Sequence, residues 1–233
     1  MRDSDFAAWV GVFEAAADQR RRAADLDWDQ PVRLDPAILK SVRRFQVGED
    51  GDGANLISKA ARAGNDAYTA AVRLFVAEER NHARMLAHLL NAAGVATLSG
   101  HWSDTAFVWL RRMLGLQVEL MVLMIAEVIA LRYYQALHEG THDQLTVEVA
   151  ALILADEQRH VPFHRHRLRQ CFARLPGPIR TLTVAAWWCL MAGALTVVAL
   201  DHGTALRRLG LTRTRFIRDV VHQFTKVATE SDK

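Results

Sequence analysis

Two Glu-x-x-His motifs are the strongest chemical signal in this sequence of 233 residues. The first runs from Glu79 to His82 and the second from Glu157 to His160. On a helix this spacing puts the carboxylate and the imidazole on one face, about one turn apart, so that both can bind the same metal ion. The motifs are related by a shift of 78 residues, since 157 minus 79 and 160 minus 82 both equal 78.

Two further glutamates follow the same shift. Glu49 lies 30 residues before the first motif and Glu127 lies 30 residues before the second. A turn is expected midway in each half, at Gly64 and close to His142. Residues equidistant from the turn of an antiparallel helical hairpin lie at the same level along its axis. Each hairpin therefore brings a lone glutamate opposite a Glu-x-x-His motif.

Two such hairpins packed together would bring four carboxylates and two imidazoles to one interior point. This donor set is unsuited to structural zinc, too rich in oxygen for copper, and suited to a pair of iron or manganese ions. The alternative is chance spacing of surface residues, but Glu127 stands in the apolar run 121–131, where a solvated carboxylate is out of place. The predicted metal ligands are Glu49, Glu79, His82, Glu127, Glu157 and His160.

On these residues the sequence resembles the ferritin-like di-iron carboxylate superfamily, whose four-helix bundles carry the order Glu, Glu-x-x-His, Glu, Glu-x-x-His. The resemblance covers about residues 36–172. It implies that Glu79 and Glu157 bridge the two metal ions and take part in catalysis, whereas Glu49 and Glu127 are terminal ligands. Residues 156–160, Asp-Glu-Gln-Arg-His, resemble the Asp-Glu-x-Arg-His signature of the oxygen-activating members.

The same resemblance gives Asp156 a supporting role, as a hydrogen-bond partner that orients a metal-bound imidazole. Glu78 is expected to take this role in the first motif. That motif departs from the signature, because it has Glu78 where an aspartate is expected and Asn81 where an arginine is expected.

The chain is predicted to be all-α, since alternating strand patterns are nearly absent and helical spacing is frequent. We expect one ferritin-like domain over residues 1–233, with an N-terminal helix, a metal-binding four-helix bundle over 36–172 and two accessory helices over 179–228. The predicted helices cover 4–24, 36–64, 66–94, a start after 103 to 139, 141–174, 179–200 and 212–228. Gly48, Gly51 and Gly53 indicate either a break in the second helix or a close approach by backbone or ligand.

The positions one turn from the predicted ligands define the surroundings of the metal ions. Most are expected to be plain core, but small residues there would leave room for dioxygen or a substrate. Either Tyr133 or Tyr134 is a candidate hydrogen-bond donor or redox group, with simple helix packing as the alternative. The predicted substrate pocket comprises Phe45, Gln46, Phe75, Met124, Ala130 and Tyr134.

Residues 138–142, His-Glu-Gly-Thr-His, match the zinc-peptidase pattern His-Glu-x-x-His. That chemistry requires one continuous helix, whereas Gly140 is a natural helix stop. Thr141 and Gln144 form a potential capping box for the next helix. We therefore expect a turn at this point and not a peptidase site.

The predicted function is a dioxygen-activating, non-haem di-iron oxidase or oxygenase that acts on a small organic substrate. A manganese/iron pair is an alternative cofactor, and a ferroxidase, iron-storage or peroxide-detoxifying protein is the alternative function. The two cysteines form no Cys-x-x-Cys electron-transfer module, so electrons are expected from an external donor. A net charge of +3 with scattered basic residues gives no nucleic-acid footprint. The absence of a signal sequence and of a disulfide framework favours a cytoplasmic location.

Residues 181–200 contain no charge and are long enough to be a marginal membrane-spanning helix. They are rich in alanine and glycine and lack aromatic residues at both ends, which favours close helix packing. We expect this helix to pack on the bundle or to form a homodimer interface, with membrane contact as the less favoured alternative.

Overall fold

The computed structural model describes residues 4–100 and 115–231, and in this part of the chain all regular structure is helical. The prediction of an all-α fold is confirmed. The helices are α1 (Ser4–Arg22), α2 (Pro36–Glu49), α3 (Ala54–Arg62), α4 (Asp66–Ala92), α6 (Leu116–Gly140), α7 (Gln144–Phe172), α8 (Gly177–Asp201), α9 (Gly203–Arg208) and α10 (Arg213–Ser231).

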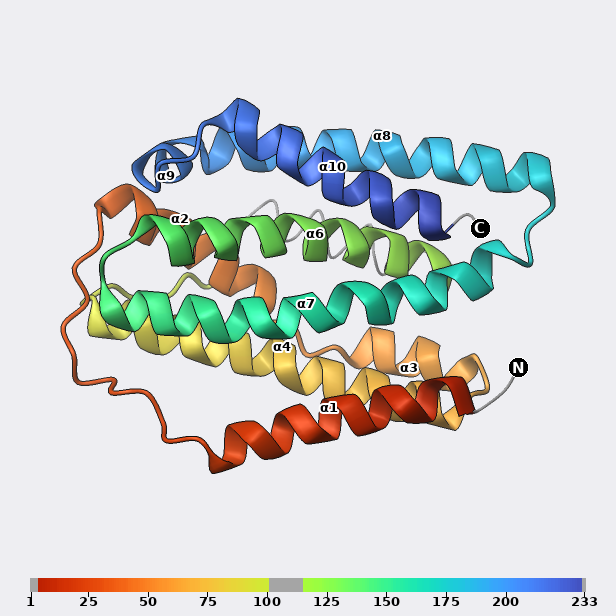
Figure 1. Cartoon of the computed structure of the whole chain (residues 1–233), viewed down its shortest axis with the longest axis horizontal. Helices are drawn as coiled ribbons and strands as arrows, with labels where there is room; N and C mark the ends of the chain where they lie inside the picture. Colours follow the sequence, from red (N-terminus) through yellow and green to blue (C-terminus); the bar gives the residue numbers. More distant parts are fainter. Residues whose placement is uncertain (1–3, 101–114, 232–233) are drawn as a thin grey trace.

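Two helical hairpins form the centre of the molecule. Helix α2 packs against α4, α6 packs against α7, and α4 joins the two pairs by packing against α7. Helices α4 and α6 run in the same direction, so the chain between them returns along the length of the bundle (Figure 1). Helix α1 lies against α4 on one side, and α8 and α10 lie beside α6 on the other.

The predicted helix over 36–64 is wrong as a continuous element, because residues 50–53 interrupt it. Gly53 has a φ of 63° and precedes α3, and a Cβ atom at this position would overlap the side chain of Val76 on α4. A left-handed conformation and a close approach to a neighbouring helix both favour glycine. The break makes Glu49 the last residue of α2.

The turn between α6 and α7 separates the two histidines of the peptidase-like pattern. Helix α6 ends at Gly140, and His142 lies in the turn outside both helices. The prediction of a turn is confirmed, but the predicted capping residue is wrong. Asp143, rather than Thr141, caps α7, and its carboxylate accepts a hydrogen bond from the backbone N–H of Thr146 at 2.9 Å.

The return connection and the C-terminal region also differ from the prediction. Helix α6 begins at Leu116, and the predicted earlier part of this helix falls in residues 101–114, outside the described residues. After α8 the chain forms the short helix α9 before α10, so three helices stand where two were expected.

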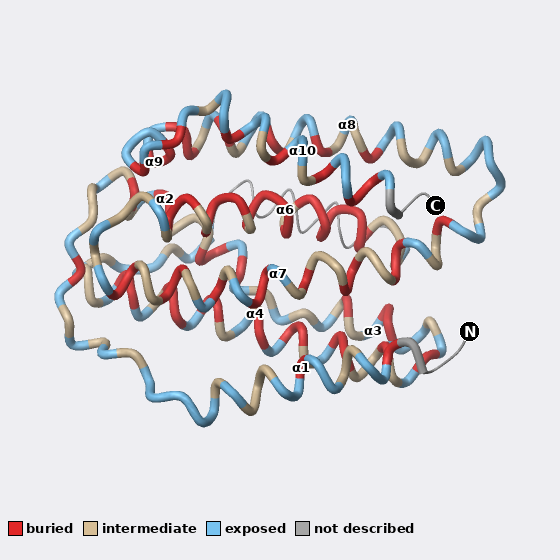
Figure 2. The backbone as a smooth tube through the Cα atoms, viewed as in Figure 1, coloured by how far each residue is buried: buried red, intermediate tan, exposed pale blue. Residues whose placement is uncertain are grey.

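Burial separates α6 from α8. Most residues of α6 are buried, whereas α8 buries only one face, which carries Trp187, Met191, Leu195 and Ala199 (Figure 2). The indole N–H of Trp187 donates to the backbone oxygen of Met121 at 2.8 Å and fixes α8 on α6. Packing on the bundle therefore accounts for one face of this helix, and Leu182 on its outer side is 72% exposed.

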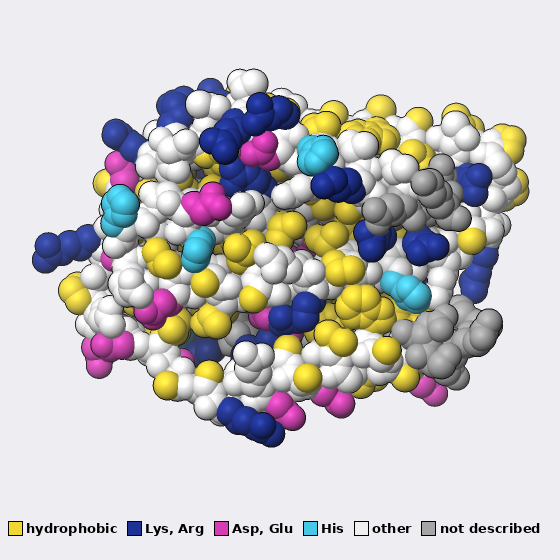
Figure 3. Space-filling view, viewed as in Figure 1, with side chains coloured by type: hydrophobic (Ala, Val, Ile, Leu, Met, Phe, Trp, Pro, Cys, Tyr) yellow, Lys and Arg dark blue, Asp and Glu magenta, His cyan; other side chains and the backbone are white. Residues whose placement is uncertain are grey.

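Hydrophobic side chains follow the outer edge of the molecule over α8 (Figure 3). By length and composition α8 is apolar enough to cross a membrane, and 22% of its most apolar window is buried. One such helix is weak evidence for a membrane protein, and the contacts of its inner face tie it to the bundle.

Replacement of Gly53 by alanine is expected to destabilise the protein by about 2–4 kcal/mol, because it combines a left-handed backbone with overlap of Val76. Gly48→Ala is the matched control. Gly48 lies within α2 with open space around it, so alanine there should be neutral or stabilise by up to about 1 kcal/mol. Chemical denaturation measures both changes, and equal stability of the two variants would contradict the assigned role of Gly53.

Candidate metal centre

The six residues predicted as metal ligands converge at the centre of the bundle. Glu49 comes from the end of α2, Glu79 and His82 from α4, Glu127 from α6, and Glu157 and His160 from α7. The structure contains two groups that could each hold a metal ion, and they share Glu79 and Glu157. One group is Glu49, Glu79, His82 and Glu157, and the other is Glu79, Glu127, Glu157 and His160.

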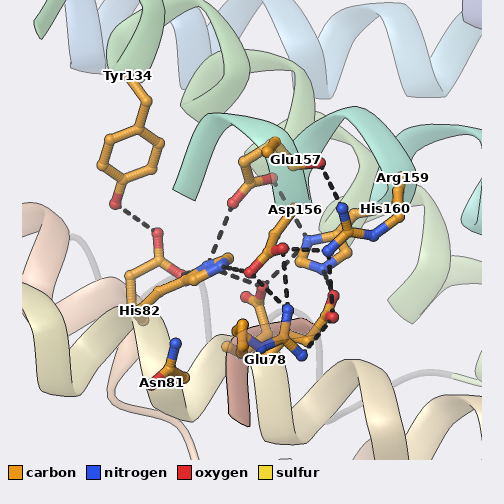
Figure 4. Close-up of polar contacts among 12 residues, drawn as sticks. Glu78, Asn81, His82, Tyr134, Asp156, Glu157, Arg159 and His160 are labelled. Atoms are coloured by element: carbon orange, nitrogen blue, oxygen red, sulfur yellow. Dashed lines mark hydrogen bonds and ion pairs between the residues drawn. The ribbon is translucent and has the colours of Figure 1, made fainter. Parts of the chain in front are cut away.

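The two imidazoles are oriented by carboxylates from the opposite repeat (Figure 4). Nε2 of His82 lies 3.0 Å from Oδ2 of Asp156, and Nε2 of His160 lies 2.9 Å from Oε2 of Glu78. If each Nε2 carries the proton, Nδ1 of each ring presents its lone pair to the candidate metal positions. Asp156 and Glu78 thus lie where they can fix both tautomers.

Two arginines bind these supporting carboxylates, and neither was predicted as a site residue from the sequence. Arg20, on α1, contacts Glu78 at 2.7 Å and Asp156 at 3.1 Å. Arg159, on α7, contacts Glu78 at 3.3 Å and is also paired with Asp156. Arg159 belongs to the Asp-Glu-x-Arg-His signature and could have been found there, whereas no spacing relates Arg20 to the repeats.

Asn81 of the first repeat stands where the second repeat has Arg159. Its side-chain oxygen accepts hydrogen bonds from Arg84 at 3.0 and 3.2 Å. The arginine missing from the first repeat is therefore matched in space by Arg20, which comes from outside the repeat.

Tyr134 and Tyr133 have different partners. The Tyr134 hydroxyl donates to Oε1 of Glu49 at 2.7 Å, and burial together with that carboxylate raises its pKa well above the usual value. Tyr134 therefore remains a hydrogen-bond donor. The Tyr133 hydroxyl instead contacts Ser41 at 2.9 Å, away from the six convergent residues.

The other residues of the predicted substrate pocket are buried or partly buried around the centre. Phe75 meets the His160 ring edge-on at 4.7 Å, and Phe45 lies 5.7 Å from the ring of Tyr134. Gln46, Met124 and Ala130 are buried. A cavity of about 540 Å³ lies elsewhere, lined mainly by residues 30–35 of the linker after α1 and by the α6–α7 turn. None of the residues that line this cavity belongs to the predicted substrate pocket.

The pKa values of the convergent carboxylates shift in opposite directions. Burial and repulsion from neighbouring carboxylates raise the pKa of Glu79 and Glu157 well above the usual value of a glutamate. Burial also raises the pKa of Glu127, but its contacts with His160 outweigh this effect and lower the pKa to about 2. Burial lowers the pKa of His160, yet its carboxylate partners raise it well above the ordinary value overall.

Several buried polar atoms of the site make no hydrogen bond, which shows whether the site suits a pair of metal ions. Nδ1 of His82, Nδ1 of His160, Oε1 of Glu79 and Oε2 of Glu157 are buried and make no hydrogen bond, although Nδ1 of His160 lies 3.2 Å from Oε1 of Glu79. Unpaired buried polar atoms are rare and costly in folded proteins. All four belong to the two groups of potential metal donors, so the donor set fits two metal ions.

Comparison with known proteins identifies the fold. No protein-family model and no curated protein matches the chain. Among solved structures, an R2-like ligand-binding oxidase without metal cofactor is 13% identical with a TM-score of 0.70, over 95% of this chain and 96% of that one. Two mutants of an R2-like ligand-binding oxidase with a Mn/Fe cofactor are 14% identical, with TM-scores of 0.70 and 0.69, over 95% of this chain and 92% of theirs.

The chain has the ferritin-like fold. The prediction of a ferritin-like bundle with additional helices is confirmed, because the similarity spans nearly the whole chain on both sides.

Metal binding is expected to release protons. In metal-free protein the raised pKa values favour protonated Glu79, Glu157 and His160, and two divalent cations would displace those protons. Calorimetric titration with Mn²⁺ in buffers of different ionisation enthalpy measures the release. A binding heat that is independent of the buffer would contradict it.

The stability of metal-free protein is expected to fall as the pH rises above the mildly acidic range. A group with a raised folded pKa contributes stability below its unfolded pKa, 4.5 for glutamate and 6.5 for histidine, and loses it as the pH rises through the folded value. Glu78 and Asp156, whose pKa values are lowered, act in the opposite sense at more acidic pH. Thermal unfolding as a function of pH checks this, and metal-loaded protein should show a weaker pH dependence.

Proposed function

We propose that this protein is a dioxygen-activating, non-haem oxidase or oxygenase with an Fe/Fe or Mn/Fe pair, acting on a small organic substrate. The observation that carries the proposal is the convergence of four carboxylates and two imidazoles. They form two groups of potential metal donors that share Glu79 and Glu157, and both groups contain buried atoms without a hydrogen bond. The solved neighbours support it, since they are named oxidases and several carry a Mn/Fe cofactor.

The six predicted ligands would hold such a metal pair in different ways. Glu79 and Glu157 belong to both donor groups, which suits bridging ligands. Glu49 with His82 would complete one position, and Glu127 with His160 the other. When bound, the metal pair would supply the reduction of dioxygen and the oxidation of the substrate.

The surrounding side chains orient these ligands and exclude water. Asp156 and Glu78 hold the imidazoles, and Tyr134 holds Glu49. Buried apolar side chains, including Phe75 and Met124, limit the access of water to the centre, where the Glu79 side chain is 21% exposed, and this strengthens electrostatic interactions inside it. Phe45, Gln46, Phe75, Met124, Ala130 and Tyr134 remain the proposed substrate surroundings, and an external protein or small reductant remains the proposed electron source.

Glu157→Ala is expected to reduce binding from two metal ions per chain to one or none, because both donor groups lose a member. Glu148→Ala, on the same helix and partly exposed, is the matched control and should keep two. Metal analysis after anaerobic loading with Fe²⁺ and desalting measures the stoichiometry. Two ions per chain in the Glu157 variant would refute the assigned site.

Oxygen uptake by anaerobically iron-loaded protein is expected to yield an oxidised organic product when a suitable substrate is present. An oxygen electrode and mass spectrometry of candidate substrates detect it, and Glu157→Ala should show neither uptake nor product.

The mass of the protein in solution distinguishes an oxidase from the alternative function, iron storage. An oxidase is expected as one chain or as a homodimer through residues 181–200, whereas a shell of many subunits that accumulates iron would favour storage.

A further inference from the structure

His164 is a fully buried histidine near the centre that the proposed function leaves without a role. It lies on α7, one turn after His160, and both of its ring nitrogens lack a hydrogen-bond partner. His82 and His160 each leave only Nδ1 unpaired, because a carboxylate binds their Nε2. A buried imidazole with two unpaired nitrogens is a cost to folding that a leucine at the same position would not carry.

The surroundings of His164 direct one nitrogen at a predicted ligand. The rings of Phe75 and His164 are nearly perpendicular with centroids 4.5 Å apart, and the Phe163 ring centroid lies 5.0 Å away, so apolar groups pack against the imidazole. Nε2 of His164 lies 3.7 Å from Oε1 of Glu127. A movement of less than 1 Å would bring these two atoms into hydrogen-bond distance, about 2.7–3.2 Å.

Glu127 is placed between two imidazoles. Its Oε2 lies 3.4 Å from Nδ1 of His160, and its Oε1 faces His164. Neither distance is that of a good hydrogen bond, so a small displacement of the carboxylate decides which nitrogen it meets. If Oε2 bound a metal ion beside His160, Oε1 would be left facing His164.

The other terminal glutamate is already fixed in the corresponding way. Oε1 of Glu49 accepts the hydrogen bond of Tyr134 at 2.7 Å, and Oε2 lies 3.9 Å from Nδ1 of His82. Each terminal glutamate thus has one oxygen toward a predicted histidine ligand and the other toward a polar donor. Tyr134 makes its hydrogen bond to Glu49, whereas His164 is too far from Glu127 to make the corresponding one.

We propose that His164 is the positioning residue of Glu127, donating its Nε2–H to Oε1 so that Glu127 binds a metal ion through Oε2 alone. This inference rests on the proposed function, because it assumes a metal ion beside His160. The unpaired imidazole gains its partner only when the site is filled, so part of the folding cost of His164 is recovered on metal binding.

The internal repeat shows which substitution the fold tolerates. The shift of 78 residues relates His164 to Leu86, since 164 minus 78 equals 86. Leu86 is fully buried on α4 and packs as core. A leucine therefore suits the position in one half of the bundle, and the histidine in the other half is not required by packing.

His164→Leu is expected to have opposite effects on folding and on metal binding. Metal-free protein should gain about 2–4 °C in melting temperature, because an unpaired buried imidazole is replaced by an apolar side chain. The affinity for the weaker of two Co²⁺ ions should fall about 10–100-fold, the usual effect of losing a partner of a metal ligand. The visible spectrum of bound Co²⁺ should also change, since a Glu127 that binds through both oxygens raises the coordination number.

Two further variants sharpen the test. His164→Gln keeps an N–H donor and is expected to restore most of the affinity and the wild-type Co²⁺ spectrum. His142→Leu makes the same chemical change at an exposed turn position and should leave affinity and spectrum unchanged. If His164→Leu fails to fold, the comparison of His164→Gln with a second variant, His164→Met, carries the test.

The outcomes separate this role from the proposed function. Wild-type protein that does not bind two Co²⁺ ions overturns the metal site and this role with it. Wild-type binding of two ions, with unchanged affinity and spectrum in His164→Leu, overturns the role of His164 alone and leaves the metal site standing.

Discussion

The mutual repulsion of buried carboxylates is the constraint on which the rest of the structure depends. Six carboxylates occupy the centre and its immediate support, namely Glu49, Glu78, Glu79, Glu127, Asp156 and Glu157. Arg20 and Arg159 compensate two of these charges, which leaves four. Two divalent cations would balance the remainder, whereas protons must do so without metal, as the raised pKa values of Glu79 and Glu157 indicate. The helices around the centre bury five of the six predicted ligands and leave Glu79 partly exposed.

The repeat made the centre predictable from sequence. Metal donors recur at fixed spacing because each hairpin must deliver them at one level, and residue numbers alone were therefore enough to group the six. The structure places all six within two overlapping groups. The helical class followed from periodicity in the same way, and Asp35 caps α2 where the sequence indicated a helix start.

Features that depend on contacts between distant segments were not predictable in this way. Arg20 lies outside the repeat, and only the packing of α1 on α4 brings it to Asp156. In the α6–α7 turn, Thr141 was predicted to cap α7, but the helix begins at Gln144 and Asp143 caps it. The break before Gly53 was one of two alternatives, because a glycine permits a left-handed turn without requiring one.

The contact of Arg20 with Asp156 has a consequence for the order of assembly in the cell. These residues are 136 positions apart, so this pair can form only after most of the chain has been synthesised, whereas Glu78 lies 58 positions from Arg20 (78 minus 20) and is available to it earlier. The first hairpin alone offers Glu49, Glu79 and His82, which lacks Glu157 of the first donor group. Neither group of potential donors is complete until Glu157 has been added, so a metal pair of the proposed kind can be bound only after both hairpins exist.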